Sequence, residues 1–176
     1  MSIFKKIYSY FDSISNEIKL INLKASIICA IISFFLGIIS WIIGGNISKI
    51  PMIYIFPRSA LPLIFAYILW GVAFAFCGFI FGGIIFGCEK FKKSQAYKIG
   101  LFIVIMQIFT FCTYPVFFGA LSPLITFILF LIAITFCVLG IVASIKVFSL
   151  WTICLIFNLL WLIYNCYVTL AFAFVN

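Results

Sequence analysis

Polar side chains set inside apolar stretches are the places where this chain could do chemistry. Near the carboxyl end, one apolar stretch contains Asn158, Trp161, Asn165 and Thr169. These residues are spaced by three or four positions, so they share one face of a helix. An asparagine in hydrocarbon is unfavourable unless it is paired, so this face must turn toward other helices. We expect it to hold helices together by hydrogen bonds, to line an apolar pocket with a few orienting polar groups, or to do both.

A second apolar stretch carries Gln107, Thr110, Thr113 and Tyr114. The pairs 107/110 and 110/114 fall on neighbouring helix faces. The same two interpretations apply to this stretch, namely interhelical hydrogen bonding and a pocket between helices.

The side chains that most reactions need are missing from these stretches. Histidine is absent, which removes the usual general base and the commonest zinc ligand. The three acids, Asp12, Glu17 and Glu89, lie outside the apolar stretches, so a transporter driven through an intramembrane carboxylate is disfavoured. No two cysteines form a CxxC pair, and buried cysteine packs as a small hydrophobic residue; the seven are Cys29, Cys77, Cys88, Cys112, Cys137, Cys154 and Cys166. We therefore expect no enzyme, no bound metal and no cofactor.

The elements that must position the polar residues are transmembrane helices. Hydrophobic residues make up 68% of the chain and charged residues 8%, against roughly 25% charged in soluble domains. A helix needs about 20 apolar residues to cross a bilayer, and five stretches qualify: Ala25–Ile43, Ala60–Phe86, Ile99–Gly119, Leu121–Ile145 and Val147–Val175. These stretches are apolar on every side, whereas barrel strands alternate over about ten residues. The predicted fold is all-α, a polytopic membrane bundle of five transmembrane helices.

The first 24 residues form a separate predicted element. Their isoleucines and phenylalanines recur at alternating spacings of three and four, with charged and amide residues between them. That spacing predicts an amphipathic helix, either lying on the inner leaflet or pairing with another helix. The predicted organisation is thus an interfacial helix over residues 1–24 and a five-helix domain over residues 25–176.

The basic residues predict the orientation. With a cytoplasmic amino terminus, nine of the eleven lie inside and two, Lys49 and Arg58, lie outside. The positive-inside rule therefore favours a cytoplasmic amino terminus and, with five spans, an external carboxyl terminus. The net charge of +8 suits anionic headgroups and needs no nucleic-acid partner. We expect an integral protein of a bacterial cytoplasmic membrane, with the lipid bilayer as its surroundings.

Three motifs carry a family resemblance. Tyr114-Pro115-Val116-Phe117-Phe118-Gly119-Ala120 resembles the end of the third span in the translocator protein family, also called tryptophan-rich sensory proteins (TspO). From Phe117 to Asn176 the family pattern fits without a gap, and its landmarks are Val147, Ser149-Leu150 and Leu160-Trp161. Upstream, Tyr67-x-x-Trp70-Gly71 resembles a stretch of the second span. The chain departs from the family at Thr110 and Thr113, where the family has Asn and Trp, and at Leu170 and Phe174, where it has Tyr and Arg.

The resemblance implies a ligand and a site. The ligand would be a hydrophobic small molecule of the tetrapyrrole class (porphyrin or haem) or another planar lipid-soluble compound, and the role would be sensory, scavenging or transport. Trp161 matches the family's cavity-lining Trp, and Trp41 and Tyr67 are further candidates for stacking on the ligand. The predicted ligand-binding residues are Trp161, Asn165, Asn158, Trp41, Tyr67, Thr110, Thr113 and Tyr114.

Some alternatives stay open at this point. The connection Asn46–Ser59 contains Pro51 and Pro57 and is either a lid over the pocket, as in the family, or a simple connection. The chain could instead be the substrate-binding membrane subunit of a vitamin or small-molecule transporter, although such subunits typically have six spans. It could also be a structural bundle without a ligand, and a homodimer is compatible with the sequence.

Overall fold

The five predicted spans are present as five long helices. A computed structural model describes residues 14, 16, 18, 19, 21–44, 60–87, 93–145 and 147–175 of the chain. Each long helix within these ranges is long and apolar enough to cross a membrane. The elements are α2 (Leu23–Gly44), α4 (Leu63–Gly87), α5 (Lys93–Tyr114), the π-helical turn η2 (Pro115–Gly119), α6 (Pro123–Ser144) and α7 (Ser149–Val175). The predicted all-α, five-helix membrane bundle is confirmed.

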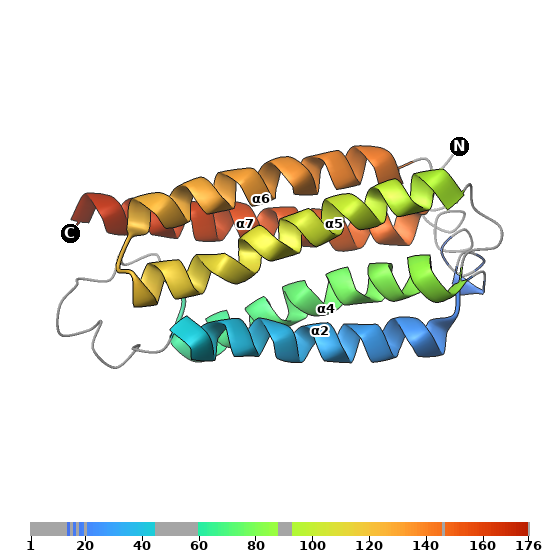
Figure 1. Ribbon diagram of the computed structural model, residues 1–176, viewed down its shortest axis with the longest axis horizontal. Helices are drawn as coiled ribbons and strands as arrows, with labels where there is room; N and C mark the ends of the chain where they lie inside the picture. Colours follow the sequence, from blue (N-terminus) through green and yellow to red (C-terminus); the bar gives the residue numbers. More distant parts are fainter. Residues whose placement is uncertain are drawn as a thin grey trace, which may run out of the picture.

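The helices lie side by side along the long axis of the bundle (Figure 1). Helix α2 packs mainly against α4, while α6 lies between α5 and α7 and packs on both. Contacts between α4 and α7 join the two groups. Helix α4 is the most buried of the five, and Trp70, Cys77 and Ile80 on it are almost fully enclosed. The bundle therefore consists of two helix groups, α2–α4 and α5–α6–α7, which meet along a seam.

Small residues bring α2 and α4 close together. A Cβ atom on Gly82 would lie 2.7 Å from the Cα of Ser26, and one on Gly71 would lie 2.6 Å from the ring of Phe34. Gly82 therefore lies at a close approach of the two helices, because only a residue without a side chain allows the two backbones to come this near. Farther along the pair, the Trp70 indole N–H donates a 3.1 Å hydrogen bond to the Ser40 hydroxyl.

A proline changes the helix geometry at the end of the third span. Pro115 has no N–H and cannot continue the α-helical hydrogen-bond pattern. The chain continues instead as η2, in which the Ala120 N–H donates to the Pro115 carbonyl oxygen at 3.3 Å. Leu121 follows with φ of +50°, an uncommon backbone conformation for a residue with a side chain. This tight turn leads into α6, which has Pro123 at its first position.

Some predicted boundaries differ from those observed. Helix α5 begins at Lys93, six residues before the predicted start at Ile99, so it includes Lys98. The apolar stretch marks only the part of the helix inside hydrocarbon, whereas a lysine near a helix end can extend its charged group toward the interface. Most of the predicted amphipathic helix over residues 1–24, and the predicted lid over Asn46–Ser59, lie outside the described residues.

Candidate functional site

A small cavity lies at the end of the bundle where α2 ends and α4 begins. All five helices contribute to its wall, with Trp41 from α2, Ala66 from α4, Tyr114 from α5, Phe130 from α6 and Asn165 from α7. Its volume is about 70 Å³. We call it the aromatic cavity, because Phe117, Phe118, Tyr164 and Phe172 also line it.

Stacked rings form one wall of the aromatic cavity. The Trp41 ring lies 4.0 Å from the Tyr114 ring, measured between centroids, with 30° between their planes. Phe118 stacks on Tyr114 at 5.4 Å and 6°, which the one-turn spacing across η2 allows. The Tyr67 ring also lies 4.0 Å from that of Trp41, with 54° between their planes. Such pairs contribute about 0.5–1.5 kcal/mol each beyond the area they bury, so this wall is both rigid and suited to a flat apolar group.

A polar pair and three threonines, Thr113, Thr126 and Thr169, interrupt the apolar lining. The Tyr114 hydroxyl donates a hydrogen bond to Asn165 Oδ1 at 3.3 Å, and the Asn165 amide N–H donates to the Trp161 carbonyl oxygen at 2.7 Å. Thr169 donates from its hydroxyl to the Asn165 carbonyl oxygen at 2.8 Å. The indole N–H of Trp41 is buried and has no hydrogen-bond partner within the described ranges. The wall of the site therefore contains a satisfied hydroxyl–amide pair and, on Trp41, a buried donor without a described partner.

The structure brings four of the eight predicted site residues to the aromatic cavity, namely Trp41, Thr113, Tyr114 and Asn165. Tyr67 does not line the cavity, but its ring lies 4.0 Å from that of Trp41, measured between centroids. Thr110 and Asn158 are buried, and each donates to the backbone of its own helix, to the carbonyl oxygens of Met106 and Cys154.

Trp161 is buried but does not line the aromatic cavity. Only 7% of its surface is exposed, so it does not face lipid. Its ring stacks on Tyr164 at 5.3 Å and 21°. Tyr164 in turn lines the cavity. Trp161 can thus act on the cavity through Tyr164, and its predicted direct role in ligand binding stays a prediction.

Tyr164 is one of the cavity residues that the sequence analysis did not predict. Its hydroxyl accepts a 2.8 Å hydrogen bond from the backbone N–H of Leu61, in the segment that leads into α4. Ala60 and Leu61 themselves line the cavity, so Tyr164 fastens one edge of the cavity to α7. The available signal was a tyrosine between Trp161 and Asn165 in an otherwise apolar span.

The described residues offer no metal centre. They contain no group of three or more His, Cys, Asp or Glu side chains that could hold a metal ion. Cys77, Cys137, Cys154 and Cys166 are buried and not joined in disulfides, and the Cys137 thiol donates to the Leu155 carbonyl oxygen at 3.3 Å. These cysteines act as packing residues in the core.

A second hollow, of about 340 Å³, lies between α2, α4 and α5, and none of the eight predicted site residues lines it.

No family model matches this chain, and no curated protein matches it in sequence. The resemblance to the translocator proteins therefore rests on the sequence motifs alone.

Proposed function

We propose that this membrane protein binds a planar, lipid-soluble aromatic molecule at the aromatic cavity and releases it chemically unchanged. The observation that supports this most is the wall of Trp41, Tyr114 and Phe118 together with the hydroxyl–amide pair of Tyr114 and Asn165. Ligand sites are typically apolar and aromatic with a few orienting polar groups. A tetrapyrrole is the ligand class that the family resemblance suggests, with sensing, scavenging or transport as its purpose.

The size of the cavity says how such a ligand would bind. Pockets for whole small molecules measure about 300–1,000 Å³, and the aromatic cavity measures about 70 Å³. It therefore accommodates one edge of a large planar ligand unless a wall moves. We infer that the Ala60–Leu61 edge is the wall that moves, since it precedes α4 and is held to α7 by the Leu61–Tyr164 hydrogen bond.

A porphyrin titration tests the proposal. The full chain, purified and monodisperse in lipid nanodiscs, is titrated with protoporphyrin IX, and the shift of the porphyrin absorbance band is followed. We expect saturable binding at micromolar strength, about −8 kcal/mol. Trp41→Ala should weaken binding by about tenfold, or ~1.4 kcal/mol, and Trp41→Phe should restore most of it because it keeps a ring in the wall.

Trp161→Ala distinguishes a ligand that contacts Trp161 from one that contacts the wall around Trp41. A tenfold loss in folded protein supports the role that the family resemblance gives to Trp161. An unchanged affinity together with a loss in Trp41→Ala places the ligand against the Trp41 wall. Absence of saturable binding to the wild type, or equal binding by wild type and both alanine variants, contradicts the proposed function.

A further inference from the structure

The larger hollow is a groove on the side of the bundle. It follows the seam between the α2–α4 pair and α5, where the two helix groups of the fold meet. Buried residues such as Phe74 and Cys77 form its floor, and exposed residues such as Leu36, Val104 and Ile108 form its rim. Because the rim lies on the outer surface of transmembrane helices, the groove is open to molecules dissolved in the bilayer. No residue lines both this groove and the aromatic cavity.

One polar group inside the groove lacks a partner. Gln107 lies near the middle of the span Ser94–Gly119, so its amide is far from the interfaces where water could solvate it. The Gln107 Oε1 atom is buried and accepts no hydrogen bond from any residue that the structure describes. A buried carbonyl oxygen without a donor is unfavourable, most of all in hydrocarbon. A bound molecule with a hydrogen-bond donor would satisfy it, after a small rotation of the amide that brings this buried oxygen to the surface of the groove.

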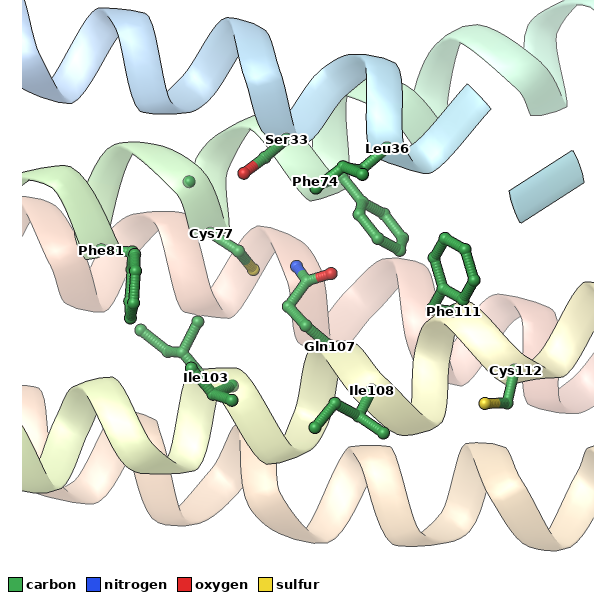
Figure 2. A pocket seen from close by; sticks show the side chains of 12 residues that line it. Ser33, Leu36, Phe74, Cys77, Phe81, Ile103, Gln107, Ile108, Phe111 and Cys112 are labelled. Carbon is green, nitrogen blue, oxygen red and sulfur yellow. The ribbon is translucent and has the colours of Figure 1, made fainter. Parts of the chain in front are cut away.

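The neighbours of this oxygen define the rest of such a molecule. In Figure 2 the Gln107 amide nitrogen points toward Cys77, and the oxygen points the other way, toward the rings of Phe74 and Phe111. A donor that reaches the oxygen therefore sits beside two aromatic rings, which favour a ring as their neighbour. The remaining lining is almost wholly apolar, and a volume of about 340 Å³ is enough for one ring with an alkyl chain.

We propose that the groove is a second binding site, for a lipid-soluble phenol. The aromatic ring of the phenol lies against Phe74 and Phe111, its hydroxyl donates a hydrogen bond to Gln107 Oε1, and its apolar chain leaves past Val104 into the bilayer. The site is independent of the aromatic cavity and of its proposed ligand.

Three matched probes test the hydrogen bond. Para-octylphenol carries the donor, octylbenzene lacks any polar group, and para-octylanisole keeps only an acceptor. Binding is measured with the full chain in nanodiscs and corrected by nanodiscs without protein, since all three probes partition into lipid. We expect the phenol to bind about tenfold more tightly than the other two, a difference of ~1.4 kcal/mol.

Paired variants locate the interaction. Gln107→Leu should abolish the preference for the phenol, whereas Gln95→Leu, at an exposed position on the same helix, should retain it. Val104→Trp fills the groove from its rim and should weaken binding of all three probes, and Leu101→Trp, exposed on α5 outside the groove, should not. Folding of each variant is checked by circular dichroism and size-exclusion chromatography.

Several outcomes overturn the proposal. Equal binding of the phenol and octylbenzene by the wild type shows that no donor is recognised. Equal binding of the phenol and the anisole shows that Gln107 Oε1 is not the acceptor. A phenol preference that survives Gln107→Leu, or binding unaffected by Val104→Trp, places the probe elsewhere. Protoporphyrin binding should be the same in Gln107→Leu as in the wild type, so this proposal and the proposed function can fail separately.

Discussion

The Tyr114 hydroxyl and the Asn165 side chain meet across 3.3 Å and connect α5 to α7 at the wall of the aromatic cavity. Both residues are buried, and each lies on a transmembrane helix among the polar residues that the sequence analysis singled out. The contact holds two helices together and supplies the polar point of the cavity. Its two possible roles, in stability and in ligand orientation, can be measured separately.

We expect Tyr114→Phe to destabilise the protein modestly. The change removes the donor to Asn165 Oδ1 and keeps the ring that packs on Trp41. Hydrogen bonds between transmembrane helices contribute about 0.6 kcal/mol on average and at most about 1.7. Unfolding by sodium dodecyl sulfate in mixed micelles gives the free energy, and a double-mutant cycle with Asn165→Leu isolates the pair. A coupling energy of zero would mean that the contact stabilises nothing.

Tyr164→Phe should speed the binding of protoporphyrin. This substitution removes the hydroxyl that holds the Leu61 N–H and leaves the stacking of residue 164 on Trp161. If the Ala60–Leu61 edge must move for a large ligand to enter, the association rate in stopped-flow measurements should rise several-fold.

Tyr167→Phe is the matched control for this test. It removes a hydroxyl from the same helix at an exposed position away from the cavity, and should leave the rate unchanged. Identical rates in wild type, Tyr164→Phe and Tyr167→Phe would show that the ligand does not enter past Leu61.

The sequence predicts the helices and the faces of the polar residues well, because both follow from local rules. Apolar stretches of sufficient length must form spanning helices, and spacing by three or four places residues such as Asn158 and Asn165 on one inward face. The observed burial of both residues agrees with that expectation.

The sequence does not predict which side chain lies opposite such a face. Tyr164 and Leu61 are separated by 103 positions, and their contact depends on how α4 packs against α7. Likewise, the spacing predicts that Trp161 points inward. It does not predict that the Trp161 ring stacks on Tyr164 instead of lining the cavity. The Gln107 groove exists because two helix groups meet there, which no stretch of sequence specifies alone.

We expect the two ends of the chain to lie on opposite sides of the membrane. Five spans place the start of α2 and the end of α7 at opposite ends of the bundle (Figure 1). The basic residues Lys24 and Lys98 both lie in helices that start at the same end, which the positive-inside rule assigns to the cytoplasm. Cysteines introduced at Ser2 and Asn176, in a variant whose native cysteines are replaced by alanine or serine, should be labelled from opposite sides by a membrane-impermeant maleimide. Labelling of both from one side would contradict five spans.

Gly82→Ala should destabilise the α2–α4 pair more than its one added methyl group suggests. The new Cβ atom would lie 2.7 Å from the Ser26 Cα and 3.0 Å from the Ala25 carbonyl oxygen, and backbone atoms cannot move aside as a flexible side chain can. Overpacking of this kind costs about 1–3 kcal/mol, and unfolding in sodium dodecyl sulfate measures this loss of stability.

Gly100→Ala is the control, since its Cβ atom would meet only the Ile84 side chain at an ordinary 3.6 Å. The control should be neutral or, through better helix propensity, stabilising by up to about 1 kcal/mol. Equal effects of the two substitutions would mean that the α2–α4 contact is looser than the structure describes.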